Sequence, residues 1–450
     1  MATVIDPIPH PWRKLKDARN LADESGMESI QNRLPNRGDQ KLLVILADFS
    51  DRPGRFSGQA WGEFFFGQHG FSDYYREVSQ QQLRYVGDVV GMHGNTAVKN
   101  DERVAYVRLP HSVSHYANGE AGRGATFPRN ASGVVHDVLQ ILDEMEFDFT
   151  PYANLETGIV DNVIIVFAGQ NVRDTGDFSN SLMPTAYSLQ QPYVTRGNHK
   201  ILDFTFCPEQ RRTGAIATIG VAVHEHGHAL GMFDLYDLSE NIVGVGRYDV
   251  MGYGIEPDAE GFQHPTHFGA FSKEFLGWIR FPVNPRPFGS HDCHLAPAET
   301  GQVGQFIKLY PNGRADSDEY FLLENRQPLG FDSDWARLGL CPGLIIWHID
   351  RRLALNQDTI INNKVNTPHS PPEHCGVMVV EANGHNHMVH GKESYGQASD
   401  TWTAGRTWGD SASPSLLWDG NQSGLSVTIQ QQNEDGSLDL RIQGWMQQSI

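Results

Sequence analysis

The stretch that decides the fold of this chain is His224-Glu225-His226-Gly227-His228-Ala229-Leu230-Gly231-Met232-Phe233-Asp234, which closes an apolar run. The residues from Ala215 to Leu230 are mostly apolar and predict a buried helix. At 3.6 residues per turn, His224 and His228 lie one turn apart on the same face of that helix. Two imidazoles placed in this way are suited to binding one Zn²⁺ ion, at about 2.0–2.1 Å from each nitrogen.

The residues around the two histidines strengthen this interpretation. Glu225 is rotated by about 100° around the helix, so it is better placed to hold a water molecule at the metal than to bind the metal itself. Gly231 follows three residues after His228, where a left-handed residue can end a helix. A chain that turns there can bring the carboxylate of Asp234 back as a third ligand, which leaves the fourth position open to water. The alternative is a buried helix whose histidines only form hydrogen bonds, and this is disfavoured because such polar groups are costly to bury without a metal or partners.

A second element follows the helix, in the glycine-rich turn Tyr248-Asp249-Val250-Met251-Gly252-Tyr253-Gly254. It resembles the methionine turn of metzincin-type zinc peptidases, in which a methionine forms a hydrophobic floor under the metal. In some of those enzymes a tyrosine two residues later ligates zinc or hydrogen-bonds the tetrahedral intermediate. The resemblance makes Met251 the candidate floor and Tyr253 a candidate catalytic residue, with ordinary core packing as the alternative for the methionine and no catalytic role as the alternative for the tyrosine.

Composition narrows the class of protein further. The 450 residues are too many for one ordinary core, and 39% hydrophobic and 20% charged residues suit a folded, soluble protein. A formal net charge of −19 disfavours nucleic-acid binding. It is also compatible with calcium-binding loops, so Ca²⁺ is a second candidate cofactor, although solubility alone accounts for the charge. The four cysteines form no CxxC pair, which disfavours a cysteine-based zinc site.

Three regions are expected along the chain. Residues 1–40 read as an N-terminal extension without the apolar segment of a secretory signal, residues 41–285 as an α+β catalytic domain, and residues 286–450 as a β-rich, sandwich-like domain. The boundary is predicted at the proline-rich segment 282–287. No apolar run reaches the roughly 18 residues of a membrane span. In the first domain, strands are expected at residues 42–46, 83–90, 162–167, 183–189 and 201–206. Helices are expected at residues 73–82, 132–146 with Ser132 as N-cap, and 215–230.

Several segments together resemble the immune inhibitor A family of metallopeptidases. They occur in the family's order over about residues 41–350: Leu43–Ser50 (LVILADFS), Phe64–Leu83 (FFFGQHGFSDYYREVSQQQL), Ile164–Gly169 (IIVFAG), Ile219–Gly254, Phe268–Trp278 (FGAFSKEFLGW), Tyr320–Gln327 (YFLLENRQ) and Gly343–Asp350 (GLIIWHID). The resemblance implies a secreted zinc endopeptidase, with a zincin-like catalytic domain of twisted sheet and active-site helix followed by β-rich domains.

Matched residue by residue, the resemblance makes His224 and His228 zinc ligands and Glu225 the catalytic base. Asp234 is the matching third ligand, with Asp237 and Glu240 close enough in sequence to compete. The chain departs from the family in three features. No signal peptide is visible, only about 40 residues precede the first core strand in place of a long propeptide, and the acidic loop before the IIVFAG strand is reduced to residues 156–161, which argues against calcium at that loop.

The function expected from these features is hydrolysis of peptide bonds in protein or peptide substrates, by a monomeric enzyme. Zinc would activate a water molecule, Glu225 would act as general base and then as acid, and Tyr253 would assist zinc at the oxyanion. The substrate would lie extended along the strand at residues 183–189. The rivals are a non-catalytic, zinc-containing protein that binds glycans or proteins on the same scaffold, and a different zinc hydrolase.

The sequence contains other polar groups outside this centre. His385, His387 and His390 resemble a second metal cluster, but a solvated loop is the favoured interpretation because no carboxylate stands in a fixed relation to them. His348 is expected to be structural, and residues 324–326 are expected to belong to a buried polar network.

Overall fold

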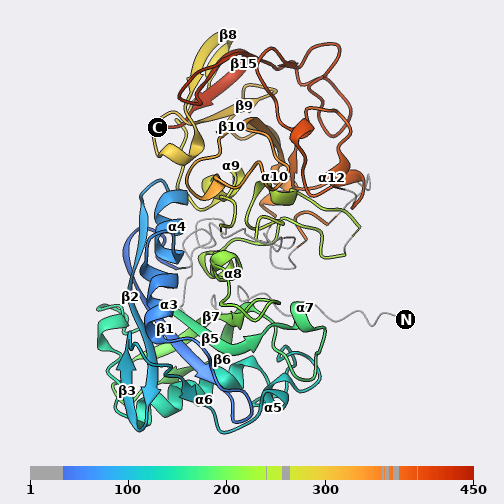
Figure 1. Ribbon diagram of the computed structural model, residues 1–450. Coiled ribbons are helices and arrows are strands. Elements are labelled where there is room, and N and C mark those ends of the chain that lie inside the picture. Colours follow the sequence, from blue (N-terminus) through green and yellow to red (C-terminus); the bar gives the residue numbers. More distant parts are fainter. Residues whose placement is uncertain are drawn as a thin grey trace. The chain divides into compact units, whose positions relative to one another are not determined.

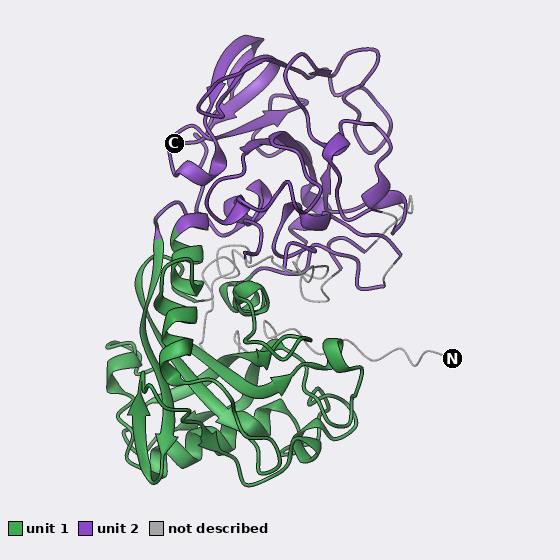
Figure 2. Ribbon diagram, viewed as in Figure 1, with its two compact units in different colours: residues 1–24, 32–76, 83–231 green, residues 25–31, 77–82, 232–450 purple. Residues whose placement is uncertain are grey.

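The computed structural model describes residues 34–239, 241–255, 264–356, 359, 364–367, 374–392 and 394–450. Most of the predicted N-terminal extension, residues 1–33, lies outside these ranges. The described chain divides into two compact units: residues 34–76 and 83–231 form the first, and residues 77–82 and 232–450 form the second (Figure 2). Residues 232–285, which were assigned by sequence to the catalytic domain, belong to the second unit.

The first unit is built on one mixed sheet with helices (Figure 1). Its elements are β1 (Gly38–Asp48), α3 (Gly58–Phe66), α4 (Phe71–Val78, whose last two residues belong to the second unit), β2 (Leu83–His93), β3 (Thr96–Lys99), β4 (Val107–Arg108), α5 (Val113–Ala117), α6 (Ala131–Glu144), η1 (Thr150–Tyr152), β5 (Asn162–Gln170), α7 (Val172–Thr175), β6 (Thr185–Val194), β7 (Lys200–Gln210) and α8 (Ile219–Leu230).

The sheet order is β3-β2-β1-β5-β7-β6, with β4 paired to the end of β1. The central strands run parallel, whereas β3 and β6 pair antiparallel with their neighbours at the two ends of this order. Parallel central strands are covered on both faces and read as continuous apolar runs. The continuous apolar runs at residues 42–46 and 162–167 are such strands, and the predictions made from them are confirmed by β1 and β5.

Alternation of side chains along the strands divides the core into two layers. Ile45 of β1 and Phe206 of β7 point into a hydrophobic cluster that includes the apolar face of α6. Thr205, the residue before Phe206, points to the opposite face and contacts His226 of α8. The two sides of the sheet are therefore covered by different helices, and α8 packs against β7 and β6.

Two predicted helix starts are wrong. Asn130, not Ser132, is the N-cap of α6, because its side chain accepts a hydrogen bond from the Gly133 N–H. The helix that carries the zinc motif begins at Ile219 rather than Ala215. The preceding residues instead pair with the end of β7, where Ile216 bridges Gln210. Backbone pairing to a neighbouring strand thus outweighs the helical preference of this short apolar segment.

The second unit is dominated by an antiparallel sheet. Its elements are η2 (Gly246–Tyr248), α9 (Ala270–Phe275), β8 (Arg286–Leu295), η3 (Ala298–Thr300), β9 (Phe306–Tyr310), β10 (Glu319–Arg326), η4 (Gly330–Asp332), β11 (Gly343–Asp350), α10 (Arg351–Ala354), β12 (Val377–Val379), α12 (His387–His390), η5 (Ala398–Asp400), β13 (Thr407–Trp408), β14 (Ser426–Gln432) and β15 (Leu438–Gln448).

The order of this sheet is β12-β11-β10-β9-β15-β14-β13, and β8 adds to β15 as a branch. The long strand β15 pairs with β14 and β8 through its first half and with β9 through its second half. The described residues of this sheet therefore form one branched sheet around a core that contains Trp402 and Trp408. β8 is not predicted from the sequence, because its mostly exposed residues and its one proline, Pro287, lack a clear alternating pattern.

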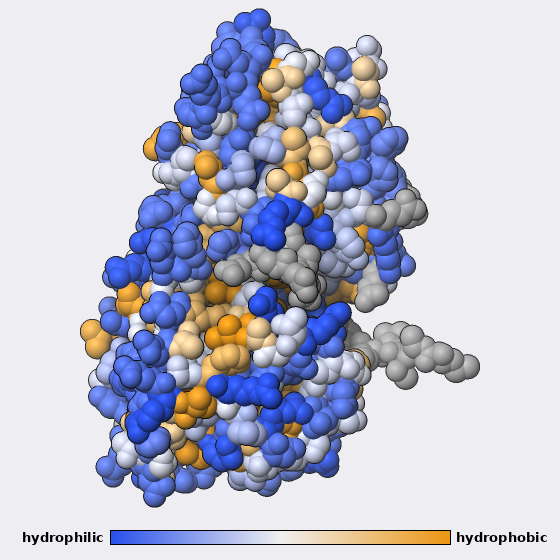
Figure 3. Space-filling model, viewed as in Figure 1, coloured by the Kyte–Doolittle hydropathy of each residue, from blue (hydrophilic) through white to orange (hydrophobic). Residues whose placement is uncertain are grey.

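On the face shown in Figure 3, hydrophilic residues predominate, and hydrophobic residues occur in groups among them. Among the described residues, no helix is long and apolar enough to cross a membrane. All four cysteines are free thiols in the structure.

Candidate metal centre

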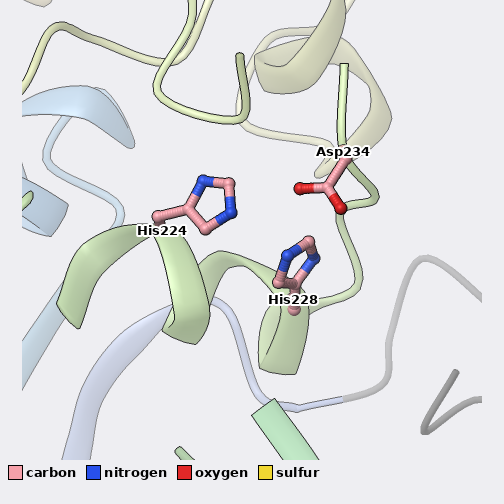
Figure 4. A group of neighbouring side chains, drawn as sticks. All are labelled: His224, His228 and Asp234. Carbon is pink, nitrogen blue, oxygen red and sulfur yellow. The ribbon is translucent and has the colours of Figure 1, made fainter. Parts of the chain in front are cut away.

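The structure brings together the side chains of His224, His228 and Asp234 (Figure 4). One potential ligand atom from each residue lies within 4.8 Å of those of the other two, and all three residues are buried. The two imidazole rings project from consecutive turns of α8, with their centroids 4.8 Å apart. Asp234 lies on the chain that follows the helix, as the spacing of the motif predicts.

The donor set suits zinc. Two imidazoles and one carboxylate are the ligand types that catalytic zinc sites use, and three protein ligands leave one coordination position open. In a tetrahedral site with bonds of about 2.0–2.2 Å, ligand atoms stand about 3.3–3.6 Å apart. Since the three atoms are already within 4.8 Å of one another, small side-chain rotations are sufficient to bring them onto one ion.

The turn at Gly231 explains how Asp234 reaches the histidines. Gly231 has a φ of 117° and caps the C-terminus of α8, and its N–H donates to the carbonyls of Gly227 and His228. Positive φ is easily adopted by glycine and costs other residues conformational energy. The helix therefore stops at this residue and the chain reverses within the three residues that precede Asp234.

The competing carboxylates behave differently from Asp234. The buried Asp237 accepts hydrogen bonds from the backbone N–H groups of Ser239, Asn241 and Ile242, at 2.9, 2.8 and 3.3 Å. Its carboxylate also accepts from the Ser239 hydroxyl. These bonds fold the turn that follows the metal segment, which gives Asp237 a local structural role. Glu240 lies outside the described residues.

Glu225 is buried on the same helix, one residue after His224. Burial, followed by the nearby charge of Glu225, raises the pKa of the Cys207 thiol well above its ordinary value. The thiol on β7 therefore stays protonated beside the glutamate. Cys207 therefore places no second negative charge beside the carboxylate of Glu225.

His226, the middle histidine of the motif, has a purely structural environment. Its Nε2 is 2.8 Å from the Tyr85 hydroxyl and its Nδ1 is 3.1 Å from the Thr205 hydroxyl. The rings of Phe71, Tyr75 and Tyr85 surround it at centroid distances of 5.0–5.6 Å. Complete burial lowers the pKa of His226 to about 3, so the ring is neutral. The spacing of the motif places His226 off the helix face that His224 and His228 share, and the structure shows which groups it contacts instead.

We expect His226→Ala to keep the metal and to lose stability. The substitution opens a cavity and leaves the hydroxyls of Tyr85 and Thr205 without their partner, which should lower the free energy of unfolding by about 2–5 kcal/mol. Urea unfolding and zinc analysis of the folded protein measure the two effects. A folded His226→Ala protein that no longer binds zinc would show that this histidine belongs to the metal centre.

The methionine turn is joined to the segment that carries Asp234. The carbonyl of Met251 accepts a hydrogen bond of 2.8 Å from the N–H of Leu235, the residue after Asp234. Met251 is fully buried. This backbone pairing explains how a turn so far along the chain supports the metal segment. The ring contacts of Tyr253 are with Tyr236 and Tyr395, at centroid distances of 5.7 and 4.5 Å.

Asp249 organises the methionine turn from inside the protein. Its carboxylate accepts hydrogen bonds from the Met251 N–H and the Gly269 N–H, each at 2.7 Å, and from the Ser272 hydroxyl at 2.6 Å. The last two bonds hold the start of α9. Burial raises the pKa of Asp249 from 3.8 to about 6, although its hydrogen bonds oppose this rise. Three donors thus hold the Asp249 carboxylate in place, although burial disfavours its charged form.

The raised pKa of Asp249 predicts a pH dependence of stability. Because the pKa is higher in the folded state, the folded protein binds more protons between about pH 4 and 6, and stability falls as the pH rises through this window. The stability difference between the parent and Asp249→Asn should shift against the parent by about 2 kcal/mol between pH 4.5 and pH 8. Urea unfolding of both proteins at these two pH values measures it. A difference that is independent of pH would show that Asp249 titrates normally.

The other polar groups singled out from the sequence lie in the second unit. The buried network at residues 324–326 is confirmed: the Arg326 guanidinium pairs with Glu324, Glu299 and Asp332. His348 is buried, lies 2.8 Å from Glu319 and stacks on Phe321, in agreement with a structural role. His385 and His390 are exposed, whereas His387 joins Glu381 and Asp400 in a second group of potential ligands that the sequence analysis did not identify.

Comparison with known proteins shows a distant similarity to metalloproteases. The chain matches no protein-family model, but it is distantly similar to a metalloprotease. The relatives are two sequences of the pre-pro-metalloprotease PrtV, from the M66-2 and ATCC 39315 / El Tor Inaba N16961 strains of Vibrio cholerae serotype O1. Each is 21% identical over 280 residues, which cover 52% of this chain and 29% of the relative. The chain therefore spans less than a third of the length of these relatives.

Proposed function

We propose that this chain is a zinc-dependent endopeptidase of the immune inhibitor A-like, metzincin type. The observation that carries the proposal is the convergence of two imidazoles and a carboxylate, from His224, His228 and Asp234, with the buried Glu225 on the same helix. The distant similarity to a metalloprotease supports the same class. By its resemblance to the immune inhibitor A family, we further propose that the enzyme acts outside the cell on protein or peptide substrates.

The residues of the centre have distinct roles in peptide hydrolysis. His224, His228 and Asp234 would hold the ion, and Zn²⁺, when bound, supplies a Lewis acid that polarises a carbonyl and lowers the pKa of water. The carboxylate of Glu225 takes a proton from the attacking water and delivers it to the nitrogen of the leaving amine. The hydroxyl of Tyr253 is the candidate donor to the oxyanion.

The edge of the first sheet offers a place for an extended substrate. β6 is the last strand in the sheet order and pairs antiparallel with β7 only, among the described strands. A peptide can add to such an edge through main-chain hydrogen bonds. Pro192 lacks an N–H and lies at a bulge between Ser188 and Tyr193, so the pairing edge is confined to the first half of β6. This half coincides with the strand predicted to bind substrate.

A casein digest by the purified protein tests the proposal. We expect cleavage at internal peptide bonds, loss of cleavage after treatment with a zinc chelator, and recovery after zinc is added back. Cleavage that survives complete removal of the metal would exclude a metallopeptidase. Stoichiometric zinc binding without cleavage of casein or of a peptide library would favour the rival, a non-catalytic binding protein on the same scaffold.

A further inference from the structure

A second cluster of potential metal ligands lies in the second unit, remote in sequence from α8. Glu381 follows β12, His387 begins the short helix α12, and Asp400 ends η5. One ligand atom of each residue lies within 4.8 Å of those of the other two. All three residues belong to the second unit, and none of them is a member of the candidate metal centre on α8.

The carboxylate of Glu381 has one oxygen in use and one without a hydrogen bond. Its Oε1 accepts from the backbone N–H of Met388 at 2.9 Å. Its Oε2 is buried and has no hydrogen-bond partner among the described residues, although it lies 3.3 Å from Nδ1 of His387. The side chain is only 1% exposed, so water does not solvate this oxygen. A buried carboxylate oxygen without a donor is costly unless a cation is bound.

The imidazole of His387 does not supply the missing proton. Its Nδ1 is 3.1 Å from Nε2 of the Gln397 amide, which can only donate, so Nδ1 presents a lone pair. The same nitrogen faces Oε2 of Glu381. Two electron-rich atoms that approach within 3.3 Å repel each other unless a positive charge lies between or beside them.

Asp400 adds a second buried negative charge. Its Oδ1 accepts from the Asn383 side-chain amide at 2.7 Å, and its Oδ2 accepts from the Gln397 N–H at 2.9 Å. Both donors are neutral, and each carboxylate oxygen keeps a free lone pair. Among the described residues, no lysine or arginine pairs with Asp400 or Glu381. A cation bound between these two buried carboxylates and the lone pair of the imidazole would neutralise their charge.

We propose that Glu381, His387 and Asp400 form a second metal site, which binds a divalent transition-metal ion, with zinc as the ion that best fits one nitrogen and two oxygen ligands. Zinc accepts mixed imidazole and carboxylate ligands, whereas Ca²⁺ prefers a set of oxygen ligands only. The ion has an entry path, because the side chain of His387 is 31% exposed while the two carboxylates are buried.

The site would brace the methionine turn. Within the loop from Glu381 to Asp400, the carbonyl of Met388 accepts hydrogen bonds from the N–H groups of Val243 and Gly244, at 2.9 and 3.1 Å. The carbonyl of Tyr395 accepts from the Arg247 N–H at 2.8 Å. An ion that joins the two ends of the loop therefore orders the backbone on which residues 243–247 rest, immediately before the methionine turn. This is a structural role, and it does not depend on the proposed peptidase activity.

Metal analysis of variants separates this site from the first centre. In His224→Ala/His228→Ala, which removes the first centre, we expect about one zinc ion per chain to remain after equilibration with zinc and removal of the excess. Adding His387→Ala should lower the affinity for this ion by more than about 100-fold, since loss of even an outer partner costs about 10–100-fold. Zinc should raise the unfolding temperature of the double variant and leave that of the triple variant unchanged.

His390→Ala is the matched control, because His390 is an exposed histidine on the same short helix. It should keep the zinc and the rise in unfolding temperature. A second ligand variant, Glu381→Gln, should behave like His387→Ala. Absence of zinc from the double variant, retention of zinc by both ligand variants, or binding of Ca²⁺ in place of zinc would each overturn the proposal. Each outcome is a metal content, so it is read without any measurement of peptidase activity.

Discussion

Glu225→Gln is expected to abolish nearly all peptidase activity while the protein keeps its zinc and its fold. The amide cannot take a proton from the attacking water, so kcat should fall by at least about 100-fold and up to about 10⁴-fold. The substitution keeps the size of the side chain and leaves His224, His228 and Asp234 untouched. Steady-state cleavage of a peptide substrate, zinc content and thermal unfolding measure the three properties.

The control for this change is Glu156→Gln, which removes the same charge from an exposed loop of the same unit. It should cleave the substrate at the parent rate. Full activity of Glu225→Gln would exclude this residue as the base. Loss of zinc from Glu225→Gln would instead indicate that the glutamate helps to hold the ion, which its place on the helix does not predict.

The second large effect is expected at the third ligand. Asp234→Ala should lower zinc affinity by more than about 100-fold and abolish peptidase activity, because only two protein ligands remain. Asp237→Ala should keep the zinc. It removes the acceptor of three backbone N–H groups and should lower the free energy of unfolding by about 1–3 kcal/mol.

Titration of both variants with zinc in the presence of a competing chelator measures the two affinities. The contrast between the two aspartates is the critical result, because both were candidates by sequence and only Asp234 lies with the histidines in the structure. Weak zinc binding by Asp237→Ala with tight binding by Asp234→Ala would reverse the assignment.

Strongly patterned elements could be predicted from the sequence. Continuous apolar runs identify β1 and β5, since central parallel strands are covered on both faces. Helical spacing identifies α6, and the motif identifies α8 together with its end at Gly231, which needs a positive φ. The start of α8 could not be predicted, because the residues before it pair with the end of β7 at Gln210, and this pairing is not visible in the apolar pattern of the helix.

The spacing of the zinc motif by itself determined which side chains share a helix face and where that helix must stop. A helix repeat and a glycine turn are local properties, so they can be read from eleven consecutive residues. Only the tertiary structure decided that His226 is a neutral core residue, that Asp237 is occupied by its own turn, and that Glu381, His387 and Asp400 meet. Burial, hydrogen-bond partners and long-range proximity arise only when distant segments pack together, so they cannot be predicted from a local sequence pattern.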